Sequence, residues 1–175
     1  FMMGEYAAEI PVDRYYAKNH MWAQSSEAGF RFGFGAYAVR LLQDVYFLDW
    51  SLDAPAVLKQ GQMIGSIERK KAESDLFVPM AGRLTQFNER LMEDPSGINV
   101  DKYGAGWLFE IENETISDAS MAGLLDPQQY LEHLGDVWKL PSEQSKGRLT
   151  GNSMGKRIAV VISQGQSQNP KKRQL

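Results

Sequence analysis

Apolar and polar residues alternate in short runs along most of the chain, the pattern of β-strands that bury one face. Residues 15–50 contain several such runs between glycine-rich breaks, and residues 83–87 and 107–111 form further runs. Helical spacing is confined to residues 37–43, to a single turn at 88–92 and to a segment near residue 130. Many short strands with Gly and Pro between them, and few helices, predict an antiparallel β-sandwich or barrelled sandwich.

The last helix has a clear predicted start. Asp126 is a suitable N-cap and Pro127 suits the first helical position, where no backbone N–H is needed. The residues that follow place an apolar stripe on one face of the helix: Tyr130, Leu131, Leu134 and Trp138. We therefore expect a capped helix with one apolar face.

The two ends of the chain are expected to lie outside the folded domain. Residues 2–8 show no period and predict a frayed lead-in. After Lys139 the chain is polar and rich in Gly, Pro and Ser, so it cannot bury enough apolar surface to offset the entropy of ordering. Residues 157–162 are an exception and predict one isolated strand that could join a sheet edge here or on a partner. The expected division is a domain at 10–138 and a basic, largely flexible tail at 139–175.

A charged tip interrupts the apolar pattern between residues 64 and 79. Apolar residues on both sides predict two short strands, and Pro79 ends the second of them. The centre carries Lys70 and Lys71. A lysine at the tip of a rigid hairpin is open to an enzyme that acylates its amine, which makes the lysines of this tip candidates for modification. The simpler interpretation is a solvated surface charge.

Composition excludes several classes of site. The 175 residues are 43% hydrophobic, enough for one core, and include no cysteine, so disulfides, thiol nucleophiles and thiolate metal sites are excluded. The two histidines lie in no His-Glu-x-x-His motif, and no Gly-x-Ser-x-Gly elbow occurs. Residues 151–157 resemble a phosphate loop, but the glycines are too close and Arg157 stands where Ser or Thr belongs. We expect no independent catalysis and no bound metal.

The net charge of −3 conceals a strong asymmetry. Residues 139–175 hold 8 basic and 1 acidic side chains, which leaves −10 for residues 1–138. An acidic domain is a poor nucleic-acid binder, and it suits docking onto basic patches of partner enzymes. No apolar run approaches the roughly 20 residues that span a bilayer. Without a secretory signal pattern either, we expect a cytoplasmic protein.

The hairpin resembles the lipoyl-lysine hairpin of the glycine cleavage system H-protein family, which has the pattern Glu-Ser-Val-Lys-Ala-x-Ser-Asp-Leu. Glu68 takes the place of the glutamate, Lys71 that of the modified lysine and Asp75 that of the aspartate. Other segments resemble the family in the same order: His20-Met21-Trp22 and residues 33–38, 44–48, 98–109 and 124–130. The resemblance covers about residues 10–138.

This resemblance implies the barrelled-sandwich hybrid of lipoyl and biotinyl carriers, a mainly β hammerhead with a few short helices and a protruding lysine hairpin. It implies lipoic acid bound covalently to Lys71, with Glu68 and Asp75 helping a lipoate-attaching enzyme to find that lysine. The chain would be a non-catalytic carrier that shuttles the aminomethyl intermediate of glycine from glycine decarboxylase to aminomethyltransferase. Dihydrolipoamide dehydrogenase would reoxidise it.

Two alternatives remain open at this level. Arg69 and Lys70 replace the family's Ser-Val, which puts three positive charges in a row and makes Lys70 a competing acceptor. Together with the basic tail, this departure motivates the second hypothesis, a related carrier that relays lipoate to other complexes or acts as a modified-lysine signalling module. An unmodified interaction module is the third. Glu68 and Asp75 are equally consistent with plain surface charges that pair with Arg69 or Lys71. We expect His20 to be a half-buried residue beside Trp22.

Overall fold

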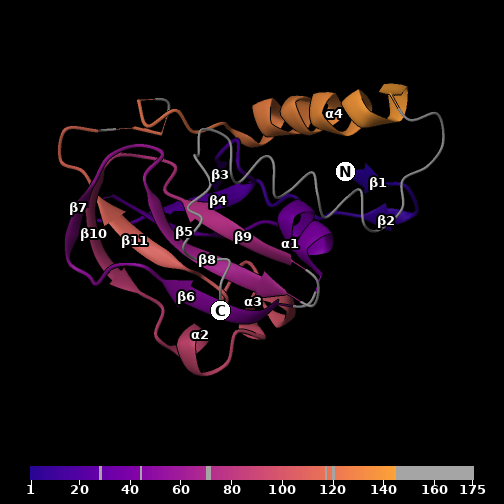
Figure 1. The fold of residues 1–175 in the computed structure, drawn as a ribbon. Coiled ribbons are helices and arrows are strands. Elements are labelled where there is room, and N and C mark those ends of the chain that lie inside the picture. The colour runs from indigo at the N-terminus through magenta and orange to yellow at the C-terminus, as the bar shows by residue number, and fades with distance from the viewer. Residues whose placement is uncertain (28, 44, 70–71, 117, 120, 145–175) are drawn as a thin grey trace.

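The computed structural model describes residues 1–27, 29–43, 45–69, 72–116, 118–119 and 121–144. Strands dominate this part of the chain, and they form a larger sheet, a smaller sheet and a short N-terminal hairpin (Figure 1). The predicted mainly β fold with a few short helices is confirmed, although the C-terminal helix is longer than the others. The candidate strand 157–162 lies outside the described residues.

The larger sheet has six antiparallel strands whose order departs from the order of the chain. In sheet order they are β3 (Tyr15–Tyr16), β4 (Met21–Ser25), β5 (Gly29–Phe34), β11 (Phe109–Glu112), β10 (Gly82–Phe87) and β7 (Ala56–Leu58). Its two edge strands are only two and three residues long, which leaves few unpaired backbone groups at the edges.

The smaller sheet has three strands, in the order β6 (Val45–Trp50), β8 (Met63–Arg69) and β9 (Ala72–Phe77). Both of its pairings are antiparallel. Within the described residues, no strand pairing joins the two sheets into one closed barrel. Three short helices complete the body, α1 (Ala36–Leu42), α2 (Arg90–Glu93) and α3 (Gly97–Val100).

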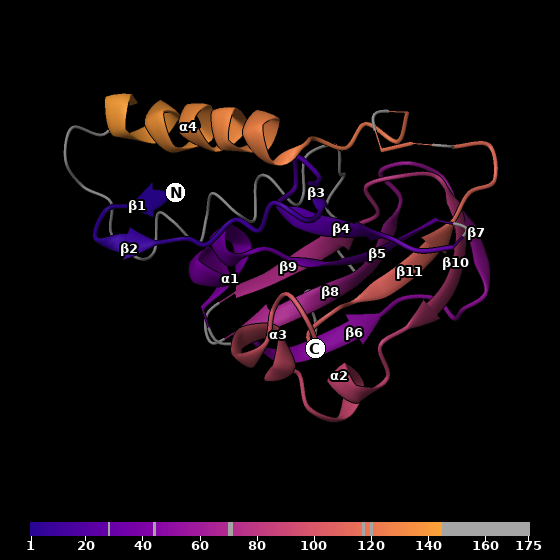
Figure 2. The same ribbon diagram turned by 180° about the vertical axis from the view of Figure 1, so that it is seen from behind.

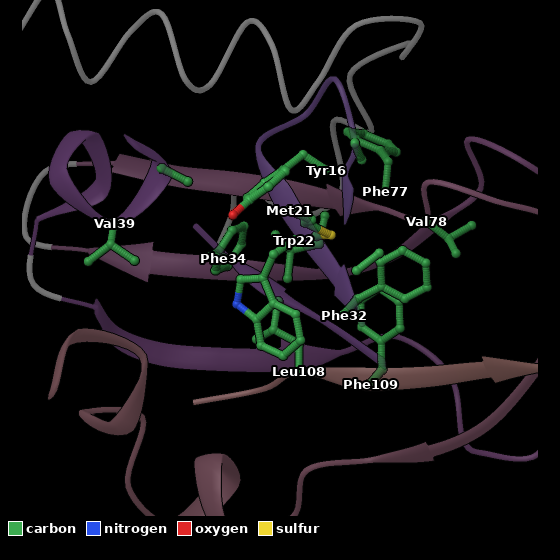
Figure 3. Close-up of a cluster of buried hydrophobic side chains, with 14 of the residues drawn as sticks. Tyr16, Met21, Trp22, Phe32, Phe34, Val39, Phe77, Val78, Leu108 and Phe109 are labelled. Atoms are coloured by element: carbon green, nitrogen blue, oxygen red, sulfur yellow. The ribbon is translucent and has the colours of Figure 1, made fainter. Parts of the chain in front are cut away.

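Aromatic side chains fill the core between the sheets (Figure 3). Phe32 of β5 stacks on Phe109 of β11 with ring centroids 5.3 Å apart. Trp50 of β6 stacks on Phe87 of β10 and meets Phe109 edge-on, so it joins the smaller sheet to the larger one. On the opposite face of the larger sheet from Phe32, Trp22 of β4 lies against Gly33, where a Cβ atom would stand 2.5 Å from the indole ring. Glycine at position 33 therefore makes room for the buried tryptophan.

The last helix, α4 (Pro127–Gln144), runs along one end of the molecule beside β3 and β4 (Figures 1 and 2). Asp126 accepts a hydrogen bond from the backbone N–H of Gln129, whose side chain accepts one from the N–H of Asp126. This reciprocal capping box confirms the predicted start of the helix. Tyr130 stacks on Tyr16 at 4.4 Å, which confirms the predicted apolar face.

Helix α4 crosses the predicted domain boundary after residue 138 and continues to Gln144. The division of the chain into a domain at 10–138 and a tail at 139–175 stays a prediction. Within the described part of the chain, no helix is long and apolar enough to cross a membrane.

The prediction of a frayed N-terminus is wrong. Residues 2–7 form a small hairpin of β1 (Met2–Met3) and β2 (Tyr6–Ala7), which turns at Gly4 with a φ of 67°. Phe1 packs edge-on against Tyr37 of α1 and Trp138 of α4. Strands of two residues are too short to show a period in the sequence, and this segment is ordered by tertiary packing, which includes the buried Met3 and the Arg40 guanidinium over Tyr6.

Candidate functional site

The candidate site is the hairpin of β8 and β9, which lies beside β6 in the smaller sheet (Figure 1). Arg69 pairs with Ala72, so two residues of the chain connect the paired positions. These residues are Lys70 and Lys71. Lys71, the predicted attachment site, lies outside the described residues, as does Lys70.

The strands leading to this connection are firmly held. Ile64, Ile67 and Leu76 are completely buried on the inner face of the sheet. On its other side β8 pairs with β6 from Arg69 to Gly65, so the hairpin is part of a sheet and not an isolated ribbon. A two-stranded hairpin alone is marginally stable in water, and this third strand and the core supply the rigidity.

Glu68 and Asp75 lie on the outer face of the same sheet, but not in one cross-strand pair. Glu68 is exposed and stands opposite Glu73, while Asp75 is half-buried opposite Ser66. Neither carboxylate pairs with Arg69, which corrects that part of the surface-charge hypothesis. Arg69 instead turns to α1, where its Nη1 donates to the carbonyl of Leu41 at 3.1 Å. Its partial burial lowers the pKa of the guanidinium.

Two acidic residues that the sequence analysis did not single out join this outer face. Glu73 lies beside Glu68, and Asp49 of β6 lies beside Ser66. The alternation of β9 places Glu73 with Asp75 and is a signal in the sequence itself. The position of Asp49 on this face depends on the pairing register of β6 with β8, which no local sequence pattern predicts.

His20 is completely buried, whereas the sequence predicted a half-buried side chain. Its Nδ1 lies 2.9 Å from the hydroxyl of Tyr130, and its ring lies 4.5 Å from that of Tyr37. Helix α4 supplies Tyr130 and so closes over the histidine. Burial, assisted by the nearby His133, lowers the pKa of His20 to about 3. The neutral imidazole is therefore the form that the folded protein holds.

This burial predicts a pH-dependent stability. In the unfolded chain His20 has a pKa near 6.5, so below that pH the unfolded state binds a proton and the folded state does not. The contribution of the neutral, buried His20 to folding stability is therefore complete above pH 6.5 and falls as the pH drops. Between about pH 6.5 and 5 we expect the free energy of unfolding to fall by up to about 1 kcal/mol per pH unit. Chemical denaturation across this range measures it.

The matched variant is His20→Asn, because asparagine tolerates the positive φ of 71° found at this position. Its unfolding free energy should vary less steeply with pH over the same range, whatever its absolute stability. Equal slopes for the two proteins would contradict the assignment to His20.

A cleft of about 350 Å³ lies between α4 and the end of β9 that is remote from residues 70 and 71. Its lining includes Lys18, Asn19, Phe77 and His133. Three aromatic residues at 103–109 differ in burial. Phe109 is fully buried, Trp107 is half-buried beneath the Arg31 guanidinium, and the half-buried Tyr103 donates from its hydroxyl to the carbonyl of Glu9.

Comparisons with known proteins all point to one family. The sequence profile of the family described as "Glycine cleavage H-protein" matches residues 14–137. A glycine cleavage system H protein of Mycolicibacterium gilvum is 36% identical over 131 residues, which are 74% of this chain and 99% of that protein. One of Thermus thermophilus is 32% identical over 126 residues, 72% of this chain and 96% of that protein.

The fold agrees with these sequence matches. The crystal structure of a glycine cleavage system H protein from Mycobacterium marinum superimposes with a TM-score of 0.60 at 28% identity. The superposition covers 73% of this chain and 98% of the other. Relatives are thus matched over nearly their whole length, while about a quarter of this chain has no counterpart in them.

Proposed function

Because the chain belongs to the glycine cleavage H-protein family, we propose that it is a lipoyl carrier with lipoic acid bound as an amide to Lys71. The observation that carries this proposal is the register of the hairpin. Arg69 pairs with Ala72 in a region that the family match includes, and Lys71 is one of the two residues between them. A lysine between paired strands suits presentation of its amine to a second enzyme.

The protein's own contribution would be presentation and not chemistry. When attached, the lipoyl group supplies a dithiolane that can be reduced, loaded and reoxidised. The chain holds the attachment point on a rigid sheet and tethers the group at high local concentration for the partner enzymes. On this proposal the carrier is non-catalytic, and the partners are glycine decarboxylase, aminomethyltransferase and dihydrolipoamide dehydrogenase. Between the first two it shuttles the aminomethyl group of glycine.

Glu68 and Asp75 are proposed as recognition residues for the lipoate-attaching enzyme. Glu68 is exposed beside the residues that connect the strands, and no hydrogen bond or ion pair with a described residue occupies its carboxylate. Asp75 is less accessible and lies farther from the tip. Of the two, Glu68 is therefore the better placed to meet the attaching enzyme.

The second candidate function, a related carrier that relays lipoate or serves another complex, draws on Arg69, Lys70 and the basic tail at 139–175. The contact between Arg69 and the carbonyl of Leu41 reduces the force of that argument. With Arg69 held against α1, the replacement that most changes the acceptor region is Lys70. Carriage of lipoate for glycine cleavage remains the better-supported function.

Peptide mapping of protein from lipoate-supplied cells tests the attachment site. We expect one lipoyl group on Lys71 and none on Lys70, because the spacings to Glu68 and Asp75 are those of the family motif. The variant Lys70→Arg should keep the added mass, and Lys71→Arg should lose it completely. A lipoyl group on Lys70, or an unmodified chain in these cells, would refute the proposal.

A further inference from the structure

The outer face of the smaller sheet carries a concentrated negative charge, which we call the acidic face. Its register sets Phe47, Glu68 and Glu73 in one row across the strands, and Asp49, Ser66 and Asp75 in the next row. The row between them consists of Leu48, Ile67 and Ser74, which are buried on the inner side. No lysine or arginine belongs to either outer row.

This charge is not compensated within the described residues. Glu68 and Glu73 are both exposed and stand directly opposite each other, an arrangement that is unfavourable for like charges. None of the four carboxylates takes part in an ion pair or hydrogen bond with a described residue. On the larger sheet, by contrast, Glu110 is paired with Arg31 at 2.6 Å. The acidic face therefore favours a cationic occupant.

An exposed apolar side chain on this face indicates that the occupant has apolar as well as basic side chains. Phe47 lies in the same row as Glu68 and Glu73, and 66% of its surface is exposed. A purely hydrophilic cation would leave this ring in water. A segment that combines basic with aliphatic residues would cover the ring and meet the carboxylates together.

Residues 145–175 have this composition. They contain seven basic residues and no acidic one, and Arg157 is followed directly by Ile158, Ala159, Val160, Val161 and Ile162. This segment follows α4 and lies beyond residue 137, where the family match ends. It is thus a feature that this chain adds to the family domain.

The segment is long enough to reach the acidic face. A flexible chain of about 30 residues has a mean end-to-end distance of about 30 Å, the diameter of a small domain. Because it is attached to the same chain, its effective concentration at the face is of the order of millimolar. A weak electrostatic contact is then sufficient for substantial occupancy.

We propose that residues 145–175 dock on the acidic face of their own chain, with basic side chains on its four carboxylates and aliphatic ones against Phe47. The docked segment covers the surface next to residues 70 and 71 and competes with basic surfaces of partner enzymes. This regulatory consequence rests on the proposed function of Lys71, whereas the docking itself does not.

Paramagnetic broadening in the full-length chain tests the docking. The protein has no cysteine, so Ser167→Cys provides a single site for a spin label. We expect strong broadening of backbone amide signals at 47–49, 66–68 and 73–75, and little at β10 and β11. Raising NaCl from about 0.05 M to about 1 M shortens the screening length to about 3 Å and should remove the broadening. The measurement uses unlipoylated protein, so its failure is distinct from failure of the attachment site.

Two charge-matched double variants provide the control. Asp49→Asn with Glu73→Gln should reduce the broadening at the acidic face at least about twofold, since half of its carboxylates are lost and their effects are roughly additive. Glu27→Gln with Glu114→Gln removes the same charge from exposed positions at one end of the larger sheet and should leave the broadening unchanged.

Three results would overturn the proposal. If the broadening is absent, or is spread evenly over the domain, the segment does not dock on the acidic face, and a partner protein becomes the expected occupant. Broadening that appears only between labelled and unlabelled copies in a mixed sample would assign the segment to a second copy of the chain. Broadening that persists in about 1 M NaCl would rule out a contact based on charge.

Discussion

Replacing Lys71 with arginine is expected to reduce glycine cleavage by a reconstituted system to the level measured without this protein. Acylation requires a neutral amine, and the arginine guanidinium stays protonated at any pH that the protein tolerates. The substitution preserves the positive charge, so a loss of activity would reflect the missing attachment point. Glycine-dependent release of carbon dioxide with the three partner enzymes measures the effect.

The neighbouring lysine supplies the control for this experiment. Lys70→Arg preserves the same charge one residue away and should keep most of the activity. Activity that survives Lys71→Arg would contradict the assignment of Lys71. A wild-type protein that carries lipoate on Lys71 but does not support glycine cleavage would instead favour the second function, a carrier for another complex.

Replacing Trp22 with alanine is expected to lower the free energy of unfolding by about 3–5 kcal/mol, the usual cost of truncating a buried tryptophan. The side chain is only 1% exposed and lies against Gly33. Its Nε1 donates to the carbonyl of Lys102 at 2.8 Å, and the Arg14 guanidinium stands 4.8 Å from the ring. Truncation removes these contacts and leaves a cavity. Chemical denaturation, with a reversible transition, measures the loss.

Trp107 offers a matched comparison for this prediction. It is half-buried on the same face of the larger sheet as Trp22, where the Arg31 guanidinium lies 4.2 Å from its ring. Because part of the ring already meets water, Trp107→Ala should cost clearly less than Trp22→Ala. Equal losses would show that Trp22 is not the dominant tryptophan of the core.

Short-range signals in the sequence predicted several elements well. The helix predicted at 37–43 is found at 36–42, and the capped start at Asp126 and Pro127 is found with the reciprocal hydrogen bonds of a capping box. The hairpin strands on both sides of residues 70 and 71 are present as predicted. These features depend on residues a few positions apart, so their physical causes lie within the local sequence.

Long-range packing accounts for the predictions that differ from the structure. Phe1 orders the N-terminal hairpin through Tyr37 and Trp138, which lie far along the chain. His20 is fully buried because Tyr130 of α4 covers it, and the local pattern around His20 contains no trace of that helix. In both cases the stabilising free energy comes from contacts between segments that are distant in the sequence, and hydrophobic periodicity does not predict such contacts.

The sequence by itself determined the β-rich class of the fold, the candidate hairpin with Glu68 and Asp75, and the order of segments that identifies the family. Only the tertiary structure decided that Asp49 joins Glu68, Glu73 and Asp75 on one face and that Arg69 turns away to α1. Strand propensity and capping act between neighbours in the chain. Strand register is selected by the burial of whole faces, and a shift of one residue would turn every side chain of β6 over.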